Sequence, residues 1–183
     1  RTPIGGTFFE VGTGWRLNVP LACWLCGAAR TITVDLNRYL KSDLIAEDVR
    51  YLHRNERQVR ELFEARAGDM FDETRWRQLQ SCAVRTADDF CRMIGVEYHA
   101  PADATNTALP DEYVDYHISC NVLEHIPREV LTGIFQEATR IVAPDGLLVH
   151  RVDHSDHFSH TDPALSAIHF LRYSDAQWDR FAN

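Results

Sequence analysis

Short apolar segments alternate with longer amphipathic ones along the chain. Five of the apolar segments have the length of a β-strand: the first begins at Phe8, and the others occupy residues 31–35, 96–99, 114–120 and 147–152. The fourth has a continuous rather than an alternating apolar character, which is typical of a strand whose two faces are both covered by helices. The pattern therefore predicts an α/β fold built on a doubly wound, mostly parallel sheet.

Apolar residues at helical spacing fill the segments between these strands. Helices are expected from about residue 17 to Gly27 and from 128 to 142. Residues 43–94 are amphipathic and far longer than the dozen or so residues that a parallel crossover needs. We therefore expect a helical insertion between strands 2 and 3. It is either an exposed cover on the sheet or a lid that selects a substrate, and the sequence leaves both open.

Composition narrows the class of protein. The chain has 183 residues, of which 45% are hydrophobic and 25% charged, so a single domain over 1–183 is expected. Its net charge of −8 argues against a nucleic-acid partner, because such proteins carry a basic face. The chain begins at Arg1 without a methionine, and we expect the natural protein to extend further.

The expected compartment is the cytoplasm. No apolar run approaches the roughly 20 residues that cross a bilayer, and no secretion signal is present, so no membrane partner is expected. The five cysteines form no regular framework, which suits a reducing compartment. Cys23 and Cys26 match C-x-x-C, but they lie late in an apolar helix and are expected to be buried there. The sequence carries no signal for an oligomeric state.

The end of the first strand holds the strongest chemical signal. Gly12 and Gly14 lack a Cβ, so the backbone there can turn sharply and approach a ligand. The next strand ends in Asp35, some twenty residues later, where a doubly wound fold places an acid against ribose hydroxyls. A glycine pair alone also occurs where a buried strand simply turns a corner. Strand, glycine turn, helix, strand and acid together favour a nucleotide site.

These motifs resemble those of the class I S-adenosylmethionine-dependent methyltransferases, which have a Rossmann-like sheet. The family's E-x-G-x-G turn corresponds to residues 10–14, and its acid after strand 2 to Asp35. An Asp-plus-small pair after strand 3 is matched by 103–104, and V-L-E-H-I-P by 122–127. Residues 140–148 are similar to the segment that precedes strand 5. The resemblance extends over most of the chain.

The resemblance implies S-adenosylmethionine as the cofactor. Gly12 and Gly14 would approach its methionine part, Asp35 would accept hydrogen bonds from both ribose hydroxyls, and Asp103 would take the adenine amine. The full set of implied cofactor residues is Glu10, Gly12, Gly14, Asp35, Leu36, Asp103, Ala104 and Asn121. The implied activity is transfer of a methyl group to a small molecule or a glycan precursor.

The sequence departs from the family at two places. Arg16 occupies the position where many members have a third glycine, and residues 158–183 hold no convincing counterpart of strands 6 and 7. Two alternatives therefore stay open. One is an NAD-dependent oxidoreductase, although the last glycine of G-x-G-x-x-G is absent. The other is a non-catalytic Rossmann-like module.

A histidine-rich stretch over 150–160 follows the fifth strand. His154, Asp156 or His157 could remove a proton from an acceptor as the methyl group arrives, which suits an imidazole near neutral pH. Imidazoles and carboxylates also bind zinc or iron, but the spacing of His154, His157 and His160 matches no fixed ligand pattern, so no metal is expected. A purely structural loop is the third reading.

Overall fold

The computed structural model describes residues 2–178 and 180. The chain divides into two compact units, Arg1–Arg151 and Val152–Asn183. The larger unit holds the sheet and the helical insertion, and the smaller one holds the histidine-rich stretch. That the whole chain forms one methyltransferase-like domain stays a prediction.

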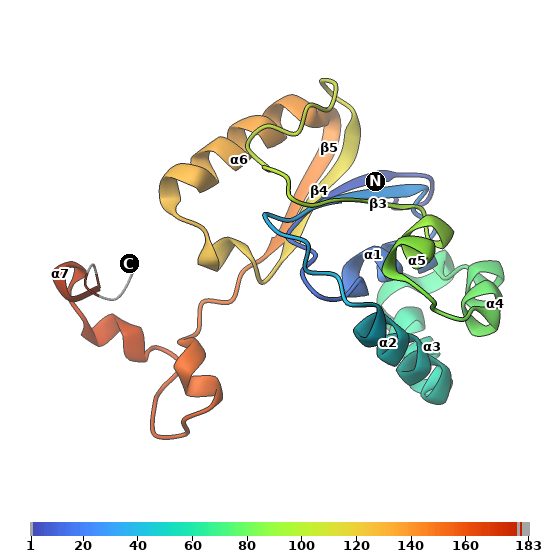
Figure 1. Cartoon of the computed structure of the whole chain (residues 1–183), viewed down its shortest axis with the longest axis horizontal. Helices are drawn as coiled ribbons and strands as arrows, with labels where there is room; N and C mark the ends of the chain where they lie inside the picture. The colour runs from blue at the N-terminus through green and yellow to red at the C-terminus, as the bar shows by residue number, and fades with distance from the viewer. Residues whose placement is uncertain (1, 179, 181–183) are drawn as a thin grey trace. The chain divides into compact units, whose positions relative to one another are not determined.

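A five-stranded, all-parallel sheet forms the centre of the larger unit (Figure 1). Its strands are β1 (Thr7–Val11), β2 (Arg30–Val34), β3 (Val96–His99), β4 (Val114–Cys120) and β5 (Val142–Arg151). They lie in the order β3-β2-β1-β4-β5. Strands β2 and β3 are added on one side of β1 and the last two on its other side, so the strand order switches between the neighbours β1 and β4. The predicted α/β, Rossmann-like class is confirmed.

Strand β5 differs from its predicted bounds. It was expected from residue 147, but it begins at Val142 directly after a helix. Val114 of β4 pairs with Val142, whereas Tyr116 pairs with Leu147, so the residues between them bulge out of the ladder. Gly146 lies in this bulge, and a Cβ there would be 2.9 Å from the carbonyl oxygen of Asp115. The turn-forming residues around Gly146 are thus accommodated as a bulge inside β5, and the strand follows the preceding helix without a loop.

Helices cover both faces of the sheet. Helix α1 (Asn18–Leu25) packs on the face that carries Phe8 and Ile118, and α6 (Arg128–Ile141) packs on the face that carries Phe9. Both lie within a residue or two of their predicted bounds. This double coverage explains why the central strands are apolar along their whole length.

The insertion consists of α2 (Ser42–Arg54), α3 (Glu56–Ala67), the short 3-10 helix η1 (Gly68–Met70), α4 (Glu73–Ser81) and α5 (Ala87–Met93). It has a core of its own, in which Trp76 and Leu79 are fully buried and join residues of α1. Asp72 caps α4 by accepting hydrogen bonds from the amides of Thr74 and Arg75. The insertion is therefore a packed part of the larger unit, and a role in selecting a substrate stays a prediction.

One arginine ties the insertion to α1. The guanidinium of Arg75 donates to the carbonyl oxygens of Trp24 and Ala28 at 2.6 and 2.7 Å. The last carbonyl groups of a helix have no hydrogen-bond partner within the helix. A cation at the C-terminal end of α1 can act as their donor, and its charge interacts favourably with the negative end of the helix dipole. The insertion therefore stabilises the end of the helix that follows the glycine turn.

The smaller unit contains η3 (His157–His160), η4 (His169–Arg172) and α7 (Asp175–Trp178). Within residues 2–178, no helix is both long enough and apolar enough to cross a membrane. The five cysteines are free thiols. Burial raises the pKa of the Cys23 thiol to about 12, which keeps it protonated, as expected for a cysteine that acts as a small apolar side chain.

Two titratable side chains are buried in the central strands. Burial raises the pKa of Glu10, on β1, from its ordinary 4.5 to about 7, although Thr13 and Thr33 hydrogen-bond to it. Burial lowers the pKa of His117, on β4, from 6.5 to about 4, and the nearby His150 adds to this shift. Both groups therefore favour their uncharged forms in the folded state.

The two groups give stability opposite dependences on pH. The folded state holds the Glu10 proton more tightly than the unfolded state, so this contribution is complete below pH 4.5 and is lost as pH rises to about 7. The folded state resists protonation of His117, so that contribution is complete above pH 6.5 and is lost as pH falls to about 4.

We predict that substituting each group tilts the pH profile of stability in opposite directions. Relative to the natural chain, His117→Phe should become progressively more stable as pH falls from 6.5 to 4. Glu10→Gln should become progressively less stable from pH 7 to 4.5. Urea unfolding at a series of pH values measures both, and profiles parallel to the natural one would contradict these protonation states.

Candidate active site

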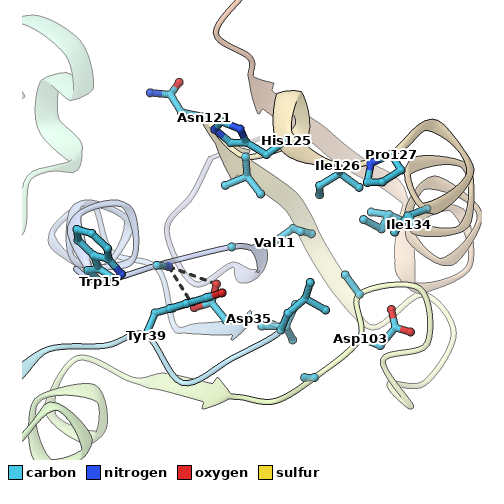
Figure 2. Close-up of a pocket in the computed structure, with 18 residues that line it drawn as sticks. Val11, Trp15, Asp35, Tyr39, Asp103, Asn121, His125, Ile126, Pro127 and Ile134 are labelled. Atoms are coloured by element: carbon cyan, nitrogen blue, oxygen red, sulfur yellow. Dashed lines mark hydrogen bonds between the residues drawn. The ribbon is translucent and has the colours of Figure 1, made fainter. Parts of the chain in front are cut away.

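A cavity of about 800 Å³ opens at the carboxyl ends of the strands of the larger unit. This volume is within the range of small-molecule and cofactor sites. Its walls come from the turns after β1, β2, β3 and β4 and from the start of α6 (Figure 2). The lining residues are Val11, Gly12, Gly14, Trp15, Val34, Asp35, Leu36, Tyr39, Ala102, Asp103, Ala104, Asn121, Val122, His125, Ile126, Pro127, Val130 and Ile134.

The glycine turn forms one wall of the cavity. Gly12 and Gly14 have φ angles of 76° and 69°, in the left-handed region that favours glycine. A Cβ on Gly12 would lie 2.7 Å from a methyl carbon of Val122, whereas a Cβ on Gly14 would meet nothing within 4 Å. Gly12 is therefore required for packing, and the space beside Gly14 is open to a ligand.

Asp35 is held against this turn. Its carboxylate oxygens accept hydrogen bonds from the Gly14 amide at 3.1 and 3.4 Å, drawn as dashed lines in Figure 2. Burial raises the pKa of this carboxyl, while the Gly14 amide and the Tyr98 hydroxyl act in the opposite direction. Asp35 is thus a fixed hydrogen-bond acceptor on the cavity wall.

Asp103 and Ala104 lie in the loop after β3. One carboxylate oxygen of Asp103, Oδ1, accepts a hydrogen bond from the Thr105 amide at 2.8 Å, which fixes the turn. Ala104 is buried against the core beneath the cavity, where it packs with Val34 and Ile134. The loop that carries the Asp103 carboxylate is therefore held in place by a hydrogen bond and by the packing of the neighbouring Ala104.

Asn121 directly follows β4 and has a strained backbone conformation. Its φ is 56°, a left-handed value that asparagine tolerates better than most residues, and its amide donates to the carbonyl oxygen of Arg151 at 2.8 Å. Strained residues of this kind gather at functional sites because the surrounding structure must hold them in place. Asn121 and His125 both line the cavity from the turn after β4 (Figure 2).

Glu10 is the one predicted cofactor residue of the larger unit that does not line the cavity. It is 2% exposed and accepts a hydrogen bond from the Thr33 hydroxyl at 2.9 Å. Its side chain therefore supports the strand ends behind the turn. The other seven, from Gly12 to Asn121, are brought together on the cavity walls, and their contacts with a cofactor stay predictions.

The three predicted catalytic residues lie in the smaller unit. His154 is exposed. Asp156 is 8% exposed, and its carboxylate accepts a hydrogen bond from the Phe158 amide at 2.9 Å, at the start of η3. His157 lies 3.7 Å from the Asp153 carboxylate. Asp156 thus has a structural role in this unit, and a catalytic role for any of the three stays a prediction.

Eleven of the cavity residues were not predicted from the sequence, and three of these, Trp15, Tyr39 and His125, have aromatic rings. Trp15 is 62% exposed although it is large and apolar, Tyr39 follows the Asp35 turn, and His125 follows β4. The signal for Trp15 and Tyr39 was their place just after the glycines and the acid. The signal for His125 was its position inside the V-L-E-H-I-P segment that was compared with the family.

We predict that Gly12→Ala destabilises the fold much more than Gly14→Ala. Both variants force an L-residue into a left-handed conformation, at a cost of about 1–2 kcal/mol, but only Gly12→Ala also forces Val122 to move. Gly5→Ala is the matched control, since Gly5 has a φ of 73° and free space around it outside the cavity. Equal losses for Gly12 and Gly5 in urea unfolding would contradict the packing argument, and Val122→Ala should partly rescue Gly12→Ala.

Comparison with known proteins agrees with this architecture. Residues 77–150 match the family model of a methyltransferase domain. This range includes the Asp103 loop and the turn after β4 but not the glycine turn, which the structure brings to the same cavity. A search of curated protein sequences finds no match.

Two solved structures have a similar fold. A phosphoethanolamine N-methyltransferase from Haemonchus contortus, in complex with phosphoethanolamine and S-adenosylhomocysteine, is 12% identical with a TM-score of 0.50. The alignment covers 85% of this chain and 24% of that one. A protein from Pyrococcus horikoshii is 16% identical with a TM-score of 0.50, over 81% of this chain and 50% of that one.

These identities show the fold alone, and the chain spans half or less of the length of both structures. The family model adds the methyltransferase motifs to that fold. The resemblance drawn from the sequence is confirmed to this extent: residues 77–150 are similar to a methyltransferase domain, and the larger unit has a Rossmann-like fold that methyltransferase structures share.

Proposed function

We propose that the chain binds S-adenosylmethionine in the cavity and transfers its methyl group to a small-molecule or glycan-precursor acceptor. The observation that carries this proposal is the convergence of the glycine turn, Asp35, Asp103 and Asn121 on one cavity in a chain with methyltransferase motifs. The match with a phosphoethanolamine N-methyltransferase in complex with S-adenosylhomocysteine supports the same choice of cofactor.

The residues present fit the chemistry of that cofactor. The Asp35 carboxylate can accept hydrogen bonds from two ribose hydroxyls, and Asp103 can accept one from the adenine amine. The open space beside Gly14 lets the chain come close to the methionine part. Leu36 and Ala104 offer apolar surface for the adenine ring.

The cofactor supplies an electrophilic methyl group on a sulfonium, so the protein's main task is orientation. The turn after β1 and the loops after β2 and β3 would hold the cofactor, while the turn after β4 faces the remaining space. Placing the acceptor atom in line with the methyl carbon is worth several kcal/mol of the barrier. Asn121, fixed by its left-handed backbone, would position the reacting groups.

His125 is the cavity residue best suited to accept a proton from the acceptor. Like Asn121, it lines the cavity from the turn after β4 (Figure 2). A neutral imidazole accepts a proton near neutral pH, so it can take one from a hydroxyl or an ammonium group as the methyl is transferred. His154, Asp156 and His157 remain the rival candidates for this role.

We predict that Asp35→Asn weakens binding of S-adenosylmethionine and S-adenosylhomocysteine by about 10- to 100-fold, because a hydrogen bond to a charged group is worth roughly 1.5–3 kcal/mol. Calorimetric titration measures both ligands, with NAD in a third titration. Asp69→Asn, an exposed carboxylate on the insertion, is the matched control and should bind normally. Binding of NAD alone would overturn the proposal, and binding of none of the three would favour a non-catalytic module.

We predict that His125→Gln lowers turnover by about 100-fold or more while leaving the affinity for S-adenosylhomocysteine nearly unchanged. Release of S-adenosylhomocysteine in the presence of a panel of small hydroxyl and amine acceptors measures turnover. His154→Gln, Asp156→Asn and His157→Gln in the same assay test the rival bases. Full turnover in His125→Gln, with a large loss in one of the others, would move the base to the histidine-rich stretch.

A further inference from the structure

The smaller unit gathers two imidazoles around one carboxylate. The Nε2 atoms of His157 and His160 lie 3.7 and 3.8 Å from the same oxygen of Asp153, Oδ2. The two imidazole rings are 5.3 Å apart. All three side chains are reachable from solvent, with exposed fractions of 43%, 52% and 30% for His157, His160 and Asp153.

These distances are close to those within a metal's coordination shell. Zinc binds nitrogen and carboxylate oxygen at about 2.0–2.2 Å, so two ligand atoms on a tetrahedral ion are about 3.4 Å apart. The Asp153 oxygen is within a few tenths of an ångström of that separation from both imidazoles. The centroids of the two imidazole rings are 5.3 Å apart, so the histidines must also turn toward each other before all three ligands reach one ion.

The carboxylate is already oriented for this task. Its other oxygen, Oδ1, accepts hydrogen bonds from the amide and the hydroxyl of Ser155 at 2.9 and 2.6 Å, so Oδ2 is the oxygen turned to the histidines. Ligating carboxylates are commonly oriented by hydrogen bonds of this kind. The sequence spacing had grouped His154 with the other histidines, whereas the structure brings Asp153 to them.

Protons must be rearranged when an ion binds. The Ser155 hydroxyl lies 2.8 Å from Nε2 of His160. Because that hydroxyl donates to Asp153, its oxygen accepts from Nε2–H of His160 in the metal-free form. On binding, His160 would carry its proton on Nδ1 and give the Nε2 lone pair to the ion.

We infer that Asp153, His157 and His160 form a binding site for a divalent transition-metal ion of the zinc, iron or cobalt type. Two imidazoles and one carboxylate are the ligands such ions prefer, and three protein ligands leave a coordination position open to water or another ligand. None of the three ligands is among the residues that line the cavity, and binding of an ion to them can be measured without the proposed methyl transfer.

The test is titration of the full chain with Co²⁺ followed by visible absorption, and with Zn²⁺ followed by calorimetry. The expected result is one saturable ion per chain, with an affinity that rises with pH because the imidazoles must be neutral. His160→Gln keeps a hydrogen-bonding group beside Ser155 but removes the imidazole, and Asp153→Asn keeps the shape of the carboxylate. Both should weaken binding by about 100-fold, in proteins whose circular dichroism is unchanged.

His154→Gln is the matched control, since it removes an exposed histidine from the same stretch and should leave the affinity unchanged. The absence of saturable Co²⁺ binding would overturn the inference. So would binding that survives in His160→Gln, or a sulfur-to-cobalt charge-transfer band, which would assign the ion to the cysteines.

Discussion

The hydrogen bond from the Gly14 amide to the Asp35 carboxylate connects the two turns on which the cavity depends. It joins the glycine turn after β1 to the residue that follows β2, over a distance of 3.1 Å. Because Asp35 is nearly buried, the carboxylate cannot turn away to water, and the amide in turn fixes the path of the glycine turn. The parallel pairing of β1 with β2 makes this possible, since it brings both carboxyl ends to the same edge of the sheet.

Much of the fold could be predicted because its signals are local. Strands β3 and β4 have the bounds expected from their apolar runs, and Gly12, Gly14 and Asp35 lie where a parallel sheet must place them. The start of β5 could not be predicted, since Pro144 and Gly146 are ordinary turn residues. Only pairing with β4 accommodates them as a bulge within a continuous strand.

Site residues could be predicted from the sequence where the backbone conformation or the position at a strand end brings them to the cavity. They could not be predicted where their place in the site depends on the direction of the side chain. Asn121 follows from its place after β4. Trp15 and His125 depend on which way a side chain points once several turns meet, and no spacing rule gives that direction. Glu10 shows the opposite case, because it stands beside the glycines in sequence but is buried and is not among the residues that line the cavity.

That burial has a physical consequence for the turn it supports. The Glu10 carboxyl group, near the end of β1, loses its hydration on burial, and this loss outweighs the hydrogen bond from the Thr33 hydroxyl, so the group favours its neutral form. A neutral Glu10 adds no second negative charge behind Asp35, whose own charge the Gly14 amide stabilises. The carboxylate that faces the cavity can therefore remain the charged acceptor while its neighbour holds the strand ends together. The two acids, 25 residues apart in sequence, take different roles because one is sealed inside the sheet and the other is in contact with the cavity.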